Sequence, residues 1–262
     1  MNTVLISYAS PGFEPYQAIN AITGRICGFD DCRAYRPADL ADDFVRAHAG
    51  ILNQPRGAGF WLWKPYLVSR ALREVEEGDI VFYSDAAVQF VNPIRPMIDF
   101  MRSRSVDLLV LGEGFSDAAY TKRDAFILME CDTERYAWTA QRFASCFMVR
   151  MSAWSQDFIE RYLRFACDAR ILTDRPNELG EPNYPGFVDH RHDQSIFSLL
   201  TKKLDLPVFS TPFVADGLAA RGRQVLNHTR THVTPGRIIH HLLGERVLTI
   251  EHLKEFEQRS PP

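Results

Sequence analysis

The sequence has no long hydrophobic run, no excess of basic charge and no closely spaced pair of cysteines. No stretch reaches the 18 or so consecutive apolar residues of a membrane-spanning helix. The N-terminus has no basic segment followed by a long apolar one, which argues against a signal peptide. The 30 basic and 33 acidic residues leave a net charge of −3, so nucleic acid is not an expected partner. These absences predict a cytoplasmic protein.

The cysteines and the overall composition predict an ordinary globular chain. Five cysteines form no CxxC pair and no even set, so we expect reduced, mostly buried thiols. The chain also has no internal repeat and no low-complexity or charged block. With 262 residues, 46% of them hydrophobic, it is long enough to bury a core without cross-links. We therefore expect a single domain over residues 1–262.

Strands and helices are predicted to alternate along the chain. Thr3–Tyr8 and Ile80–Tyr83 are apolar runs typical of buried strands. Apolar residues at helical spacing predict a helix from Pro65 to Glu77. Further helices are expected at 93–104, 154–167 and 193–204, and further strands at 106–111, 145–151 and 207–213. This order predicts an α/β fold with a mainly parallel central sheet, whose ligands lie beyond the carboxyl ends of the strands.

Two segments rich in proline, glycine and aspartate interrupt this order, at 112–124 and 173–189. Loops longer than about 12–15 residues without secondary structure are uncommon unless they have a function. The segment 173–189 is therefore a candidate functional loop.

Asp85 follows a buried strand directly, in the sequence Tyr83-Ser84-Asp85-Ala86-Ala87. A carboxylate at that edge of the sheet could hold a divalent metal, a ribose hydroxyl or a sugar hydroxyl. The small residues around it leave room for a ligand to approach the backbone. Taken alone, an aspartate in the turn after a strand explains the pattern equally well.

Lys64 lies between two tryptophans and a proline in the segment Gly57–Pro65. The two glycines resemble a dinucleotide-binding motif only superficially, because no strand precedes them and the third glycine is missing. A lysine near a helix N-terminus is unfavourable for the helix dipole, unless it helps that end to hold a phosphate or carboxylate. The alternative is a surface lysine between two packed tryptophans.

The segment His190–Ser195 places several polar side chains directly before an apolar helical pattern. Asp193 could cap that helix. His190 and His192 are two residues apart, which raises the question of a zinc site, but neither the HExxH spacing nor a cysteine pair is present. So many polar groups at one junction favour a functional site.

In their order, these segments resemble bacterial glycosyltransferases of the GT-A fold that act in capsule and surface-polysaccharide synthesis. The matching segments are Gly59–Pro65, Gly78–Ala86, Thr121–Phe126 and His190–Leu200. The plan is also similar to that of glycogenin-like and galactosyltransferase-like enzymes. The resemblance implies a Rossmann-like nucleotide-binding part at about 1–112 and an acceptor and catalytic part at about 113–250.

The resemblance also assigns roles to residues. Asp193 and Gln194, with His192, would lie at the reacting centre. Donor binding would involve Lys64, Asp85, Ser84, Ala86, Arg191 and Tyr8. Acceptor binding would involve Lys122, Arg123 and Asp124, and Asp85 and His228 would hold Mn²⁺ or Mg²⁺.

One departure from the family pattern concerns the metal. The family has a second aspartate two residues after the first, whereas this chain has Ala87 there. Asp85 alone would offer a metal few oxygens, so the diphosphate of the donor would have to supply much of the coordination. Without a metal, Lys64, Arg191 or the pair Lys122 and Arg123 would have to neutralise the leaving diphosphate.

The expected activity is transfer of a sugar from a nucleotide sugar, with a UDP-sugar favoured, to a hydroxyl of a glycan or lipid-linked glycan. An inverting enzyme needs a base near that hydroxyl, for which Asp193 and His192 are candidates. A retaining enzyme would place a carboxylate or amide under the sugar, which points to Asp193 and Gln194. Two alternatives stay open: a metal-dependent hydrolase or phosphoesterase, and a catalytically silent nucleotide-binding module. A lipid-linked acceptor would bring the protein to the inner face of the membrane.

Overall fold

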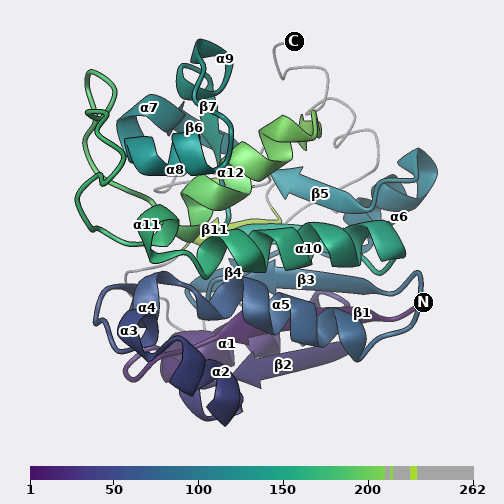
Figure 1. Ribbon diagram of the computed structural model, residues 1–262. Helices are drawn as coiled ribbons and strands as arrows, with labels where there is room; N and C mark the ends of the chain where they lie inside the picture. The colour runs from purple at the N-terminus through teal and green to yellow at the C-terminus, as the bar shows by residue number, and fades with distance from the viewer. Residues whose placement is uncertain (210–212, 215–224, 229–262) are drawn as a thin grey trace.

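A computed structural model of the chain describes residues 1–209, 213–214 and 225–228. Its centre is a six-stranded sheet in the order β2-β1-β3-β8-β5-β9 (Figure 1). The strands are β1 Thr3–Tyr8, β2 Asp31–Tyr35, β3 Ile80–Ser84, β5 Leu108–Leu111, β8 Cys146–Arg150 and β9 Val208–Phe209. β1 runs parallel to β2 and β3, β5 runs parallel to β9, and β8 is antiparallel to both its neighbours. The predicted α/β fold with a mostly parallel sheet is confirmed.

Helices cover both faces of this sheet, which is why its central strands are apolar throughout. Val81 and Tyr83 of β3 point into the core shared with α5 (Trp63–Arg73), α10 (Ala153–Ala166) and α12 (Asp193–Lys203). Ile80 and Phe82 point to the opposite core, which includes β4 (Val88–Phe90) and α6 (Arg95–Arg104). α1 (Glu14–Ile26) packs against β1, β2 and β4.

Two smaller sheets and several short helices complete the described part. β10 (Phe213–Val214), β11 (Leu226–His228) and β4 form one sheet, and β6 (Glu113–Ser116) pairs with β7 (Ala140–Arg142). The short helices are η1 Pro37–Asp39, α2 Asp42–Ala47, α3 Ala49–Leu52, α4 Gly57–Phe60, α7 Asp117–Tyr120, α8 Arg123–Leu128, α9 Glu134–Ala137 and α11 Ala169–Leu172.

Element boundaries differ from the expectation by a few residues at most elements, and the segment 112–124, expected as a loop, forms β6, α7 and the start of α8. The helix expected at 65–77 begins two residues earlier and ends at Arg73, and its apolar face (Leu67, Val68, Ala71 and Leu72) is buried. The strand expected at 207–213 is two short strands in different sheets, Val208–Phe209 and Phe213–Val214.

All five cysteines are free, and Cys27, Cys131 and Cys146 are buried. Over the described ranges, the helices are too short or too polar to cross a bilayer.

Candidate active site

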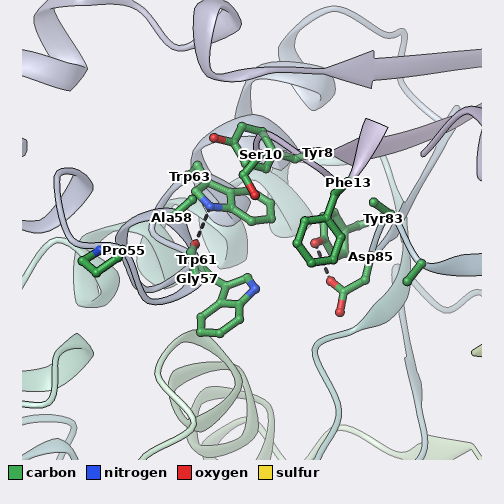
Figure 2. A pocket seen from close by; sticks show the side chains of 12 residues that line it. Tyr8, Ser10, Phe13, Pro55, Gly57, Ala58, Trp61, Trp63, Tyr83 and Asp85 are labelled. Atoms are coloured by element: carbon green, nitrogen blue, oxygen red, sulfur yellow. Dashed lines mark hydrogen bonds between the residues drawn. The ribbon is translucent and has the colours of Figure 1, made fainter. Parts of the chain in front are cut away.

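A pocket of about 260 Å³ opens at the carboxyl ends of β1 and β3 (Figure 2). Because these strands are parallel neighbours, Tyr8 at the end of β1 and Asp85 after β3 meet at the same edge of the sheet. Residues 55–63 approach from the other side. The lining residues are Tyr8, Ser10, Phe13, Pro55, Gly57, Ala58, Trp61, Trp63, Tyr83, Asp85, Ala86 and Ala87.

A left-handed turn shapes one wall of the pocket. Five consecutive residues have a positive φ: 58° at Gly57, 50° at Ala58, 95° at Gly59, 54° at Phe60 and 60° at Trp61. This conformation costs roughly 1–2 kcal/mol for each residue other than glycine. Strained backbone that is retained in this way is concentrated at functional sites. The turn gives Trp61 its position in the pocket wall.

Both glycines of the turn are required by close approaches as well as by φ. A Cβ on Gly57 would lie 2.2 Å from the Trp61 ring, and one on Gly59 would lie 2.6 Å from the Leu52 Cα. The Gly57 carbonyl accepts a hydrogen bond of 3.0 Å from Trp63 Nε1. The Trp63 ring in turn stacks on Tyr8, with centroids 3.9 Å apart. The pocket therefore has a rigid aromatic wall.

Asp85 is the acidic residue that lines the pocket. Its Oδ1 accepts a hydrogen bond of 2.7 Å from the Tyr83 hydroxyl and lies 3.7 Å from Lys64 Nζ. Its backbone N–H donates to Ser145 O at 2.8 Å, which fixes the start of the turn. The side chain is 35% exposed. One carboxylate oxygen is thus held by the protein, while the group still faces the pocket.

Lys64 is buried, at 3% exposure, so the alternative of a surface lysine is wrong. Its Nζ lies 2.6 Å from Asp193 Oδ2, donates to Ala144 O at 3.1 Å and lies 5.0 Å from the centre of the Tyr83 ring. Burial lowers the pKa of Lys64, but the carboxylates of Asp193 and Asp85 outweigh it and the net shift is upward. Lys64 is therefore held as a cation, and the anion beside it belongs to the protein itself.

Asp193 is the first residue of α12 and is equally buried. Its Oδ2 also accepts a hydrogen bond of 3.0 Å from the Tyr162 hydroxyl. Burial raises the pKa of its carboxyl, against the opposing effect of Lys64. The predicted capping role is wrong, because the carboxylate points to Lys64 and no side chain caps the helix. Lys64, Asp85 and Asp193, from three distant segments, thus meet in one cluster.

His190 and His192 are buried and hydrogen-bonded within the protein. His190 Nε2 donates to Ile171 O at 2.8 Å, and its Nδ1 accepts from the Lys122 N–H at 3.2 Å. His192 Nδ1 donates to Leu172 O at 2.9 Å, and its ring stacks on Trp61. Burial lowers the pKa of both rings, which are neutral. The His190 lone pair is already used, which argues against a zinc site at this pair.

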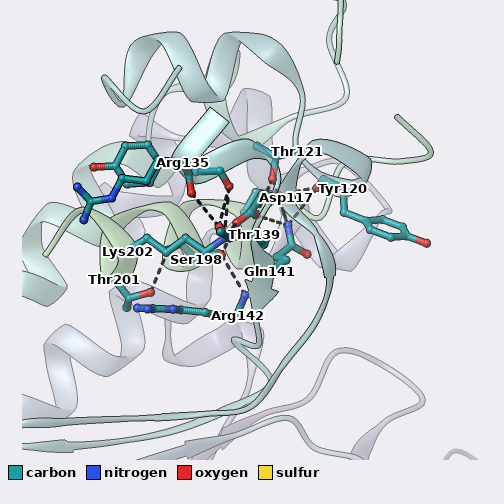
Figure 3. Close-up of polar contacts among 12 residues, drawn as sticks. Asp117, Tyr120, Thr121, Arg135, Thr139, Gln141, Arg142, Ser198, Thr201 and Lys202 are labelled. Atoms are coloured by element: carbon teal, nitrogen blue, oxygen red, sulfur yellow. Dashed lines mark hydrogen bonds and ion pairs between the residues drawn. The ribbon is translucent and has the colours of Figure 1, made fainter. Parts of the chain in front are cut away.

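A buried polar network surrounds Asp117 (Figure 3). Gln194 is joined to it through Gln141. Asp117 pairs with Lys202 Nζ at 2.5 Å and accepts from Gln141 Nε2 at 2.9 Å. Gln141 Nε2 also faces Tyr120 O at 3.3 Å, so two oxygens that can only accept lie on its amino side. Its Oε1 must therefore point away, and it accepts from Gln194 Nε2 at 2.8 Å.

This network determines the orientation of the Gln194 amide. Since the Nε2 end of Gln194 is directed to Gln141, the carbonyl oxygen is the end that remains available. Gln194 is half-buried, unlike its neighbours Asp193 and Ser195. The chain therefore presents a hydrogen-bond acceptor beside Asp193.

Of the other residues expected to bind the donor, two line the pocket and two do not. Tyr8 and Ala86 line the pocket. Ser84 is fully buried, and its hydroxyl accepts a hydrogen bond of 2.8 Å from Asn20 in α1, which points it away from the pocket. Arg191 is exposed and lies over the ring of Tyr120, outside the pocket lining.

The residues expected to bind the acceptor contact the 173–189 segment. Lys122 Nζ donates to Arg175 O at 2.6 Å, and burial lowers its pKa. Asp124 accepts from the backbone N–H groups of Glu178 and Leu179. Arg123 pairs with Asp132 and lies over the Tyr184 ring. Polar contacts thus hold this long segment against the start of α8.

A divalent metal would find one carboxylate, that of Asp85, among the residues that line this pocket. Within the described residues, no group of three or more histidine, cysteine, aspartate or glutamate side chains could hold a metal. The backbone of His228 pairs with Val88, three residues after Asp85, but its side chain lies outside the described part. Asp85 therefore fits only a metal that takes most of its ligands from a substrate and water.

Several residues of the site are not predicted by any sequence pattern. Trp61 and Trp63 were noted only as neighbours of Lys64, yet they line the pocket. Asp117 and Gln141 carry no local motif, and their partners lie up to 85 residues away. The Gly57 and Gly59 pair was the available signal for the unusual turn.

No protein-family model and no curated protein sequence matches the chain. Solved structures are similar in fold. Apo mouse xyloside xylosyltransferase 1 aligns with a TM-score of 0.51 and 9% identity, over 89% of this chain and 100% of that chain. The bifunctional glycosyltransferase WbbM aligns with a TM-score of 0.50 and 8% identity, over 98% of this chain and 52% of that one. The chain has a GT-A-type glycosyltransferase fold.

Proposed function

We propose that this protein transfers a sugar from a nucleotide sugar, with a UDP-sugar favoured, to a hydroxyl of a glycan or lipid-linked glycan in bacterial surface-polysaccharide synthesis. One observation carries the proposal. A partly exposed carboxylate, Asp85, lies in an aromatic pocket at the carboxyl edge of a GT-A-type sheet and is held by Tyr83 and Lys64. Ligands of such sheets bind at this edge.

The chemistry of the pocket suits a nucleotide sugar. The rings of Tyr8, Trp61 and Trp63 offer flat apolar surfaces for a base or a sugar face. Asp85 offers an acceptor for ribose or sugar hydroxyls, and the small side chains of Ala86 and Ala87 leave its surroundings open. Pockets that combine apolar walls with a few fixed polar groups are the usual form of a small-molecule site.

We propose that Mn²⁺ or Mg²⁺, where it takes part, is held by Asp85 together with oxygens of the donor diphosphate. Such an ion would neutralise charge on the leaving diphosphate. His228 stays a candidate second ligand because its strand runs beside β4. The reaction takes place in the cytoplasm, and a lipid-linked acceptor would bring it to the inner face of the membrane.

The residues at the starts of α12 and α8 have separate roles in this proposal. Asp193 is bonded to Lys64 and Tyr162 and is not free to act as a base, so we assign it to holding Lys64 beside Asp85. His192 is buried between Trp61 and Leu172, which leaves it a supporting role for the pocket wall. We assign the carbonyl oxygen of Gln194 to the reacting sugar, where it would stabilise positive charge on the ring. Lys122, Arg123 and Asp124 shape the acceptor side by holding the 173–189 segment.

Nucleotide binding tests the proposal. UDP, GDP, CMP and ADP are titrated calorimetrically into the protein, each with and without Mn²⁺. Selective binding of one nucleotide is expected, and Asp85→Asn, which can still accept from the Tyr83 hydroxyl, should weaken it at least about tenfold. Asp157→Asn, at a 58% exposed position on α10, is the matched control.

Two outcomes would change the assignment. No binding of any nucleotide would overturn the transferase proposal. Binding without consumption of the corresponding nucleotide sugar, even with a panel of glycan acceptors, would leave a silent nucleotide-binding module. Nucleotide binding that is unchanged in Asp85→Asn would move the site away from this pocket.

A further inference from the structure

An exposed apolar surface lies beside the start of α12, outside the pocket. Phe115 in β6 is 74% exposed, and its ring centre lies 5.4 Å from that of Tyr120. Val188, at 66% exposure, belongs to the same surface, because its backbone N–H donates to Ala119 O at 2.8 Å. With Arg191, which lies over the Tyr120 ring, these residues form what we call the Tyr120 patch: Phe115, Tyr120, Val188 and Arg191.

Arg191 gives this patch an exposed positive charge that forms no salt bridge with another described residue. Its guanidinium carbon lies 4.7 Å from the Tyr120 ring centre, and the side chain is exposed. Across the described residues it makes no salt bridge. Arg56 and Arg191 both lower the pKa of the Asp189 carboxyl, but its salt bridge, at 2.6 Å, is with Arg56. Arg123, by contrast, lies over Tyr184 but is paired with Asp132.

The patch is fixed to the proposed reacting centre by hydrogen bonds. The Tyr120 carbonyl accepts from the Arg191 N–H at 3.0 Å and from the Ser195 hydroxyl at 2.9 Å. It thereby joins both sides of the turn that carries Asp193 and Gln194. Figure 3 shows the Tyr120 side chain pointing outward, away from the polar network behind it. A ligand on the patch would lie next to that turn.

We propose that the Tyr120 patch binds the acceptor glycan and that the bound sugar unit carries an acidic group. This inference rests on the proposed transferase function. An aromatic ring packs well against the apolar face of a sugar, while a guanidinium group already stacked on that ring keeps its donors free for a carboxylate or phosphate. A neutral sugar would offer the guanidinium donors of Arg191 no charged acceptor. The patch therefore distinguishes acidic from neutral acceptors.

Saturation-transfer NMR on the full chain tests this with three probes: glucuronic acid, glucose 6-phosphate and glucose. Glucuronic acid and glucose 6-phosphate separate a carboxylate from a phosphate as the recognised group, and glucose is the neutral comparison. We expect at least one acidic sugar to bind about tenfold more tightly than glucose, as a charge-assisted hydrogen bond would allow.

Two substitutions locate the binding. Arg191→Gln should remove the preference for the acidic sugar. Phe115→Ser, at an exposed position, should lower the affinity for every sugar that binds. Arg104→Gln is the matched control, because Arg104 is also an exposed arginine over an aromatic ring, that of Phe100, in α6 at the far end of the sheet (Figure 1).

The outcomes separate this inference from the proposed function. Equal binding of acidic and neutral sugars, no sugar binding, or no effect of Arg191→Gln would each overturn the patch assignment while nucleotide binding is retained. A loss of nucleotide binding in Arg191→Gln would overturn it as well and assign Arg191 to the donor. A wild-type chain that binds no nucleotide would instead overturn the proposed function.

Discussion

The ammonium group of Lys64 lies 2.6 Å from the carboxylate of Asp193, and both side chains are almost completely buried, at 3% and 4% exposure. A buried ion pair contributes little over a well-packed apolar pair, but loss of one partner leaves the other charge uncompensated. Both groups also have neutral partners: Ala144 O for Lys64 and the Tyr162 hydroxyl for Asp193. The pair is thus a fixed part of the core. Lys64 connects it to the pocket, because its Nζ also lies 3.7 Å from Asp85 Oδ1.

Loss of one charge of this pair should destabilise the protein strongly. Lys64→Met should lower the free energy of unfolding by about 3–5 kcal/mol, because Asp193 is left as a buried charge. The double variant Lys64→Met/Asp193→Leu should recover most of that loss. Urea unfolding of wild type, both single variants and the double variant measures this coupling.

The exposed pair of Arg135 and Asp205 is the matched control, with side chains 63% and 74% exposed. Asp205→Asn should leave the free energy of unfolding unchanged within error, since exposed ion pairs contribute little. A double variant no more stable than Lys64→Met would contradict the buried-pair argument.

A side chain at Gly59 should destabilise the protein through a close contact as well as through backbone strain. A second glycine, Gly180, allows the two effects to be separated. Gly59 has φ +95° and would place a Cβ 2.6 Å from the Leu52 Cα, whereas Gly180 has φ +86° and no atom within 4 Å. Gly180→Ala should therefore cost about 1–2 kcal/mol of unfolding free energy, from strain alone. Gly59→Ala should cost about 2–5 kcal/mol, because overpacking is added to the strain.

Thermal or urea unfolding measures both glycine variants, and tryptophan fluorescence reports on Trp61 and Trp63 beside the turn. Equal losses at the two positions would mean that the close approach to Leu52 has no energetic weight.

The sequence predicted the parts of the site that depend on local pattern. The apolar run of β3 places Asp85 at the ligand-binding edge, and the helical pattern after Pro65 and Asp193 places α5 and α12. These features follow from hydrophobic periodicity, which is encoded within a few residues.

The interactions within the site depend instead on contacts between distant segments. Lys64 and Asp193 are 129 positions apart by number, so nothing local shows that they form an ion pair or that Asp193 does not cap its helix. Gln141 and Asp117 likewise have no motif. The positive φ of Phe60 and Trp61 contradicts residue preference, and tertiary packing maintains it.

The buried histidines should make the protein sensitive to mild acid. Burial holds the pKa of His190 well below its ordinary value of 6.5, and that of His192 below the same value. The unfolded chain therefore binds protons below pH 6.5 that the folded chain does not, so their stability contribution is present above that pH and lost as the pH falls.

Urea unfolding at a series of pH values between 7.5 and 5, a range chosen around the ordinary histidine pKa of roughly 6.5, measures this effect. Each histidine should add about 1.4 kcal/mol per pH unit, at most, to the slope of the free energy of unfolding against pH. His190→Gln should give a shallower dependence than wild type, whatever its own stability. An identical slope in the two proteins would contradict a buried, neutral His190.

Gln141 should affect turnover through Gln194 alone. Gln141→Met keeps the length of the side chain but releases the Gln194 amide from its 2.8 Å hydrogen bond. A reorientation of this kind should lower kcat for donor consumption by about tenfold to hundredfold, while KM for the donor stays unchanged, because misplacement of a reacting group affects the chemical step. Ser198→Ala, which removes a different hydrogen bond to Asp117 at 2.7 Å, is the control and should keep kcat close to wild type.

If Gln141 acts through Gln194, the double variant Gln141→Met/Gln194→Met should be no slower than Gln194→Met alone. Additive losses would instead mean that Gln141 supports the fold or the site by another route.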